Sequence, residues 1–436
     1  MEKIFHLKQN GTTVRTEIRA GLTTFFAMAY IIFVNPSILS ATGMNSAGVM
    51  IATCVSAAIG SALCALFSNQ PYALAAGMGL NTFFAFTLCN PDGYGYTWQQ
   101  ALGLTLLAGF LFLIITITPL RSIVIQAVPK NLKHAISAGM GLFIALIGLL
   151  NAGLITMNTG FPALGDLKSP ACLLTIFGLV VTSILVVCHV QGSLILGMLA
   201  TVLLSLITGQ TALPTQIVSA PTAFGTVFMK LRFSGLLKGS GLSAVFALTA
   251  LLFTMTMIDM FDTVGFLIGA SSAAGTMDEQ GNVPKMGQVL AADAASTMVG
   301  ALCGTSTVTS FAESSTGISA GGRTDLTSVT TGVCFLLAVF FAPLTGIVSS
   351  AATSPALIIV GMYMLMDVRN IDFSSMDQAI PAFLTILMMP MSYSITAGIG
   401  IGFIAHVICK LAARKTKELN PAMLVIGLVF LLYFCL

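Results

Sequence analysis

Charged residues are scarce in this 436-residue sequence, where Asp, Glu, Lys and Arg together make up 8%. Soluble domains carry about 25% charge, so the composition excludes an ordinary soluble protein. Hydrophobic residues make up 56% of the chain. At about 20 residues per transmembrane span, this length allows a dozen or more spans. The composition therefore predicts a polytopic membrane protein in contact with lipid, and we expect it in the plasma membrane.

Several functional motifs are also missing. The net charge of +3 and the absence of a basic tract argue against nucleic acid as a partner. The nine cysteines include no CxxC pair, so neither a metal site nor a disulfide framework is indicated. No HExxH motif and no Walker A motif occurs. We therefore expect no enzyme, no cofactor and no metal, and no transport driven by ATP hydrolysis within this chain.

Apolar segments follow one another along the sequence, and positive residues orient them with the N-terminus in the cytoplasm. A polar loop at 212–240 separates two sets of seven. The segment 420–436 is also apolar and is either a fifteenth span or an interfacial helix. The fourteen predicted spans are 21–40, 46–67, 71–88, 99–119, 132–152, 171–190, 193–211, 242–268, 287–303, 305–321, 326–348, 353–368, 378–394 and 395–412.

The two sets resemble each other. FAMAYIIFVN, which ends at Asn35, aligns without a gap with FTMTMIDMFD, which ends at Asp262. Ala57–Gly77 aligns with Ser296–Gly317 through two glycines 17 positions apart in each, and this places Glu313 over Ala73. Because seven is an odd number, the second copy would be inverted in the membrane. Inverted repeats with paired broken helices, here spans 3 and 10, are typical of secondary transporters.

A polar stretch within span 10, TVTSFAESSTGISAGG at Thr307–Gly322, carries a single carboxylate, Glu313. Its backbone and hydroxyl groups would lack partners in lipid, so it must line a cavity or be buried in protein. A carboxylate beside free backbone groups suits a flat heterocycle with several N–H and carbonyl groups. The alternative is that Glu313 caps a half-helix, with Ser314 and Ser315 as partners.

Three further acids lie at membrane depth, where a charge is a candidate functional site. Asp259 and Asp262 are three residues apart and can share one helix face. Two carboxylates that close repel, so one would be protonated or bind a cation, which suits proton coupling. The alternative is that one of them only bonds neighbouring helix ends. For Asp293 a structural or gating role is as well supported as ligand contact.

Two other side chains are candidates for contact with a ring. Asn81 is the one strong polar side chain in span 3, and its amide can donate and accept together. An interhelical hydrogen bond explains Asn81 equally well. Phe261 could stack on a planar ligand, although an aromatic side chain on an apolar helix more often packs in the core.

Four segments carry a family resemblance: GMGLNTFFAFT, MIDMFDTVGFLIG, TSFAESSTGISAGGRTDLTSV and AIPAFLTILMMPMSYSITAGIGIGF. They resemble the AzgA-like purine permeases of the xanthine/uracil, or nucleobase–cation symporter, group, from about Gly21 to Lys410. The resemblance implies an all-α fold with a seven-plus-seven inverted repeat and short strands in spans 3 and 10. It divides the chain into a cytoplasmic N-terminus (1–20), a core domain (21–120 and 241–350), a gate domain (121–211 and 351–412), an extracytoplasmic loop (212–240) and a C-terminal segment (413–436).

The resemblance also implies site residues. Asp262, which is followed three residues later by Gly265, would bind the base together with Glu313 and Asn81. We add five secondary candidates: Asp259, Phe261, Ala312, Ser314 and Ala73. Proton symport through Asp262, Glu313 and Asp259 is implied, whereas the residues alone leave H⁺ and Na⁺ both open.

The implied substrates are hypoxanthine, guanine or adenine, and a homodimer is compatible with the resemblance. The alternatives are a xanthine or uracil permease, an anion carrier or channel of the same fold, and a receptor without transport. An anion carrier predicts a basic residue near span 10 and a site without acids, and a receptor predicts a large soluble domain. The sequence has neither feature.

Overall fold

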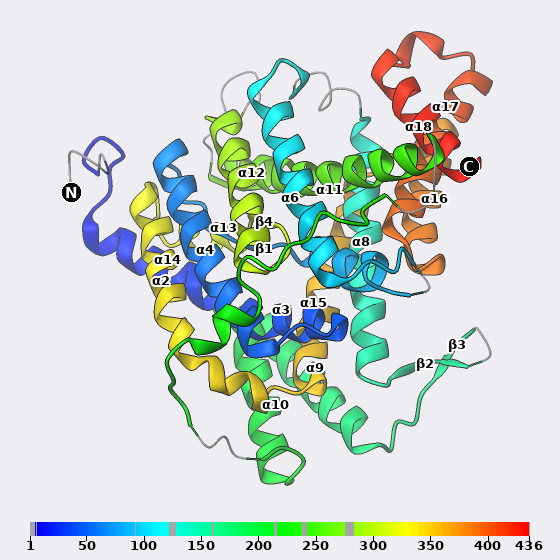
Figure 1. Ribbon diagram of the computed structural model, residues 1–436. Helices are drawn as coiled ribbons and strands as arrows, with labels where there is room; N and C mark the ends of the chain where they lie inside the picture. Colours follow the sequence, from blue (N-terminus) through cyan, green and yellow to red (C-terminus); the bar gives the residue numbers. More distant parts are fainter. Residues whose placement is uncertain are drawn as a thin grey trace.

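The computed structural model describes residues 5, 7–91, 93–121, 128–158, 161–212, 216–237, 242–274 and 283–435. Parts of the predicted N-terminal segment (1–4 and 6) and of the predicted 212–240 loop (213–215 and 238–240) lie outside these residues. Figure 1 shows the described chain as a bundle of helices around two short strands.

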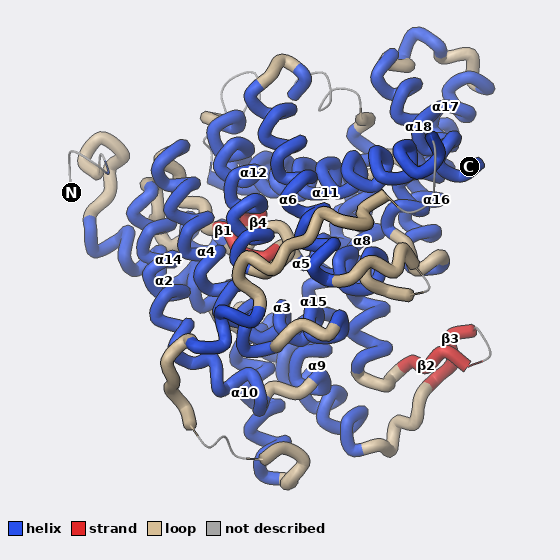
Figure 2. The backbone as a smooth tube through the Cα atoms, viewed as in Figure 1, coloured by secondary structure: helices blue, strands red, loops and turns tan. Residues whose placement is uncertain are grey.

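The first half of the chain holds helices of very different lengths. Their bounds are α2 Val14–Met28, α3 Ile31–Leu39, α4 Ser46–Ser68, α5 Met78–Phe83, α6 Trp98–Ile117, α8 Lys130–Asn151, α9 Pro170–Val187 and α10 Ser193–Ile207. A π-helix at Phe84–Leu88 continues α5. The hairpin of β2 (Ile155–Asn158) and β3 (Phe161–Leu164) extends away from the bundle (Figure 2).

The second half repeats this plan. Its helices are α11 Leu242–Ala274, α12 Met286–Cys303, α13 Ser314–Ser319, α14 Asp325–Ala338, α15 Ser350–Leu365, α16 Met376–Met391, α17 Ile395–Ala412 and α18 Pro421–Cys435. Within the described residues, ten helices are long and apolar enough to cross a membrane, and four shorter apolar helices accompany them. Thirteen of these fourteen match predicted spans. The exception is α18, which lies in the predicted C-terminal segment and not in one of the fourteen spans. Predicted span 10 has no such helix, because it consists of a strand and the six-residue α13.

Local chemistry explains where several helices begin and bend. The side chain of Asn45 accepts the Gly48 N–H at the start of α4, and Thr97 and Gln100 form a capping box at the start of α6. Span 1 bends between α2 and α3, where Ile32 N–H bonds the carbonyl of Ala29 only three residues back. Pro36 adds to the bend because proline lacks the N–H that would bond Ile32.

The two broken spans meet in a two-stranded antiparallel sheet. β1 (Leu74–Ala76) pairs with β4 (Val308–Ser310), with Ala75 opposite Thr309. Every residue of both strands is buried, and Figure 2 shows the pair in red among the helices. Each strand therefore satisfies the backbone groups of the other at membrane depth. The predicted strands in spans 3 and 10 are confirmed.

The alignment of Glu313 with Ala73 is wrong, however. Each strand is followed by a short helix, and the residue directly before that helix is Gly77 in the first half and Glu313 in the second. Ala73 instead lies before β1, where its carbonyl accepts the Phe311 N–H at 3.0 Å. The glycine spacing misled the alignment because the link from strand to helix is longer in the second half.

Most helix packing falls within two groups. In one, α4 lies between α12 and α14, with α6 against α12 and α2 against α14. In the other, α8 packs on α15 and α16, α16 packs on α17, and α9 and α10 pack on α15. Gly141 of α8 and Gly361 of α15 lie so close that a Cβ on either would collide with the carbonyl oxygen of the other. Small residues at such contacts allow close packing of helices in lipid.

Helix α18 returns along α17. Phe430 stacks on Phe403 at 5.7 Å between ring centroids, and Gly427 lies against Val407. The buried face of α18 holds Met423, Ile426 and Phe430, and it also touches α11. The apolar C-terminal segment therefore packs as a helix of the bundle.

Candidate functional site

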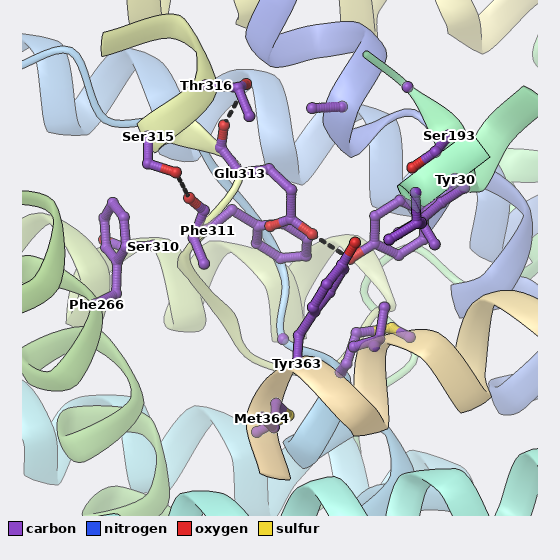
Figure 3. Close-up of a pocket in the computed structure, with 18 of the residues that line it drawn as sticks. Tyr30, Ser193, Phe266, Ser310, Phe311, Glu313, Ser315, Thr316, Tyr363 and Met364 are labelled. Carbon is purple, nitrogen blue, oxygen red and sulfur yellow. Dashed lines mark hydrogen bonds between the residues drawn. The ribbon is translucent and has the colours of Figure 1, made fainter. Parts of the chain in front are cut away.

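A cavity of about 460 Å³ opens where the strand pair meets α11 and α15 (Figure 3). Pockets for small molecules in proteins usually have volumes of about 300–1,000 Å³. The walls come from six places in the chain: the α2–α3 bend, the β1–α5 link, the α9–α10 turn, α11, the β4–α13 link and α15. Residues from both helix groups therefore enclose one space.

Glu313 supplies one carboxylate to this cavity. It lies directly before α13, but its side chain makes no capping hydrogen bond to that helix. Instead the phenolic O–H of Tyr30 donates to Glu313 Oε1 at 2.7 Å (Figure 3). The α2–α3 bend places Tyr30, which is 1% exposed, within reach of the β4–α13 link. The carboxylate is thus held toward the cavity, and the capping interpretation of Glu313 does not describe this structure.

Asp262 supplies a second carboxylate from α11. It is partly exposed, and it makes no hydrogen bond to the described residues. Phe266, one turn further along α11, also lines the cavity and packs edge-to-face on Tyr72 at 5.4 Å between centroids. An unpartnered carboxylate beside a fixed ring can accept hydrogen bonds from a planar ligand.

The facing wall comes from the α9–α10 turn and α15. Ser193 begins α10, while Tyr363 and Met364 lie near the end of α15, and all three line the cavity. Figure 3 shows the rings of Tyr30 and Tyr363 on the same side of Glu313. Carboxylates, hydroxyls and rings thus converge, whereas no Lys or Arg occurs among the described lining residues.

The predicted site residues divide into two sets. Asp262, Glu313 and Ala312 line the cavity. Asn81, Asp259, Ser314, Ala73 and Phe261 are not among its lining residues. Their roles in binding therefore stay predictions.

The second set has other contacts. Asn81 accepts a hydrogen bond from Ser306, which joins the two broken spans. Ser314 Oγ accepts the Ala73 N–H at 3.0 Å. The Phe261 ring lies beneath the ammonium of Lys133, 5.4 Å from its centroid. Lys133 lies in the first turn of α8, which begins at Lys130.

Sequence reasoning missed Tyr30, Ser193, Thr309 and Tyr363 as wall residues. Tyr30 lies inside the repeated segment FAMAYIIFVN, but a tyrosine in an apolar run looks like packing. The available signal was that the hydroxyl of a buried tyrosine usually needs a hydrogen-bond partner. For metals, the described residues contain no cluster of three or more His, Cys, Asp or Glu side chains that could hold an ion.

Comparison with solved structures agrees with the fold. The transmembrane domain of the cyanobacterial bicarbonate transporter BicA superposes with a TM-score of 0.62 at 14% identity, covering 90% of this chain and 97% of that one. SLC26A9 gives a TM-score of 0.63 at 8% identity, covering 91% of this chain and 65% of that one. The predicted seven-plus-seven fold is confirmed, and identities this low support the fold alone.

Sequence relatives are closer. Guanine/hypoxanthine permease PbuO of Bacillus subtilis is 41% identical over 98% of both chains. Adenine permease AdeP of Escherichia coli is 39% identical over 99% of this chain and 95% of its own length. The Permease family (Xan_ur_permease) matches residues 15–401. The chain therefore belongs to the Permease family, as an integral membrane transport protein and not an enzyme.

Proposed function

We propose that the protein imports purine nucleobases (hypoxanthine, guanine or adenine) by proton symport. The observation that carries the proposal is the pair of carboxylates, Asp262 and Glu313, that line one cavity together with aromatic rings. The relatives named guanine/hypoxanthine and adenine permeases point to the same substrate class.

The chemistry of a purine suits these walls. Its N–H groups can donate to the two carboxylates, and hydrogen bonds to charged groups contribute about 1.5–3 kcal/mol each. Its flat ring can stack on Phe311 or Phe266, both of which line the cavity. Exposed carbonyl or ring nitrogen atoms can accept from Ser193. Purines that differ in one exocyclic group would be separated by these polar contacts.

The two helix groups supply a route for transport. We assign the α4 group (α2, α4, α6, α12 and α14) with the strand pair to the core domain, and the α8 group (α8, α9, α10, α15, α16 and α17) to the gate domain. If the N-terminus is cytoplasmic, the α9–α10 turn that borders the cavity is cytoplasmic as well, so the cavity faces the cell interior. Movement of the core against the gate would then expose the site to each side in turn.

An anion carrier is the rival function, because the solved structures of similar fold include a bicarbonate transporter. The two carboxylates would repel an anion, and the described lining residues include no Lys or Arg to attract it. The site chemistry therefore favours an uncharged heterocycle.

Uptake by cells without their own nucleobase carriers tests the proposal. Labelled hypoxanthine, guanine and adenine should enter and compete with one another, while bicarbonate and sulfate should not compete. A protonophore should abolish accumulation. Accumulation that resists the protonophore but requires sodium would reject the proton assignment while leaving the purine assignment intact.

A further inference from the structure

Two buried aspartates brace α11 against α12. Thr297 of α12 donates to Asp259 Oδ2 at 2.8 Å, and Thr263 of α11 donates to Asp293 Oδ2 at 2.6 Å. Each helix thus contributes an Asp and, four residues later, the Thr that bonds the other helix's Asp. We call Asp259, Thr263, Asp293 and Thr297 the quartet, and none of them is more than 2% exposed.

The quartet has fewer donors than its carboxylates need. Asp259 Oδ1 and Asp293 Oδ1 are both buried without a hydrogen-bond partner among the described residues. Two ionised carboxylates in a dry interior would be strongly destabilising. One positive charge must therefore accompany the pair.

The surrounding helices do not supply that charge by direct contact. The titratable groups that face the pair are Asp262 on α11 itself and Cys64 on α4. Glu313, from the β4–α13 link, acts on Asp262. The ammonium of Lys133 on α8 lies over the Phe261 ring, and that of Lys285, directly before α12, donates to the Ser68 carbonyl. No salt bridge in the described residues involves either aspartate.

A proton fits this need better than a metal ion. Metal ions such as Ca²⁺ or Mg²⁺ require about six or more oxygen ligands, whereas the pair offers two free carboxylate oxygens. The described residues hold no cluster of metal-binding side chains here. A single proton would remove one of the two negative charges, and a neutral carboxyl costs far less to bury than an ionised one.

The quartet is connected to the cavity through β4. Thr263 Oγ1 lies 2.7 Å from Thr309 Oγ1, and Thr309 lines the cavity. Thr297 Oγ1 also accepts the Val308 N–H at 3.2 Å. A change of charge in the quartet would therefore act on the strand that leads to Glu313.

We propose that the quartet carries the coupling proton, apart from the carboxylates that contact the substrate. This proposal rests on proton symport as the function. With Asp293 ionised, Thr263 donates to it and Thr309 donates to Thr263, so Thr309 offers the cavity a lone pair. With Asp293 protonated at Oδ2, the chain of hydroxyls reverses. Thr309 then offers the cavity a donor, and substrate binding depends on the bound proton.

Purified wild type and Asp293→Asn in sodium-free liposomes test the proposal. For a symporter that moves one proton per purine, a pH gradient of one unit can drive about tenfold accumulation. We expect wild type to approach this value and Asp293→Asn to lose the accumulation. Asp293→Asn should keep gradient-free exchange of labelled for unlabelled purine, because Asp293 does not line the cavity.

Accumulation by Asp293→Asn equal to that of wild type would overturn the proposal. So would a folded Asp293→Asn protein that has lost exchange and accumulation together. If wild type itself ignores the pH gradient but exchanges purines, both the quartet and the proton symport are rejected. If wild type and Asp293→Asn both accumulate purine in response to the pH gradient, the role of the quartet is rejected and proton symport is retained.

Thr263→Val and Thr263→Ser provide a second test if Asp293→Asn fails to fold. Thr263→Val removes the hydroxyl that links Asp293 to Thr309, so uptake by this variant should lose the pH dependence of wild type. Thr263→Ser, which keeps the hydroxyl, should match wild type. Coincident pH profiles for Thr263→Val and wild type would contradict the proposal.

Discussion

Tyr30 and Glu313 are 283 positions apart and are joined by a hydrogen bond of 2.7 Å. One residue comes from the bend in span 1 and the other from the broken span 10, so this bond fixes the cavity-lining carboxylate against the first half of the chain. The bond is short, and its acceptor is a carboxylate, which makes it stronger than a bond between neutral groups.

Tyr30→Phe should weaken substrate binding without abolishing transport. The ring remains, but Glu313 loses the donor that orients it, and bonds to charged groups contribute about 1.5–3 kcal/mol. We expect KM for purine uptake to rise about tenfold, which corresponds to about 1.4 kcal/mol. The control is Tyr393→Phe, because Tyr393 contacts Phe86 and Phe143 only through its ring in the described structure. Equal KM values for Tyr30→Phe and wild type would contradict this role.

Glu313→Ala and Asp262→Ala should each abolish purine uptake while the protein remains in the membrane. Each variant removes a charged acceptor from the cavity wall. Labelled uptake and a surface-expression assay measure the two effects separately. If Asp262→Ala transports normally and Asp259→Ala does not, the assignment of Asp262 as the substrate-contacting member of the pair is wrong.

The rarity of charge made part of this site predictable. In a sequence with 8% charged residues, an acid at membrane depth such as Glu313 or Asp262 stands out because burial without a function is costly. The broken spans were predictable for a related reason, since a polar, glycine-rich backbone needs partners that lipid cannot provide. Paired strands are the solution that the fold uses.

Other parts depended on contacts that sequence does not encode locally. Tyr30 is one of seven tyrosines, and only the bend between α2 and α3 brings it to Glu313. The two halves correspond through the β1–β4 pair and the short helices after it. An alignment based on matching glycines therefore placed Glu313 over the wrong residue of the first half, Ala73. Thr263 and Thr297 look like ordinary helix threonines until α11 and α12 are placed side by side.

Asn81→Ala tests whether Asn81 contacts the substrate or only holds the two broken spans together by its hydrogen bond to Ser306. Asn81 and Ser306 bond each other, so loss of either side chain should lower stability by about 1–3 kcal/mol through the partner left unsatisfied. Ser306→Ala is therefore the matched control. If Asn81 also contacts the base, Asn81→Ala alone should alter the profile of competition among adenine, guanine and hypoxanthine. Identical profiles in the two variants would return Asn81 to a structural role.

The turn after α17 should make stability depend on pH. The hydrogen bond from Lys410, which is 2.6 Å from Glu418, lowers the pKa of Glu418 from its ordinary value of 4.5. A carboxyl whose pKa is lower in the folded state stabilises that state fully above about pH 4.5 and loses the effect as pH falls through the lowered pKa. Tm measured in detergent should therefore decline below that pH. Glu418→Gln should show a shallower decline, and parallel Tm curves would contradict the contribution of this ion pair.

Gly400 of α17 tests whether α18 is an integral part of the bundle. A Cβ at Gly400 would lie 2.7 Å from Phe430 Cδ1 and 2.8 Å from Phe434 Cε2, and Phe430 is fully buried. Gly400→Leu should therefore force α18 away from α17 and lower stability by about 1–3 kcal/mol through overpacking. Gly346→Leu is the control, because a Cβ there meets no atom within 4 Å. Equal Tm values for the two variants would mean that α18 does not pack on α17 in the membrane-extracted protein. A lower Tm for Gly400→Leu alone would show that the C-terminal helix contributes to the folded bundle, since Gly400 meets no closer neighbour than the two α18 rings.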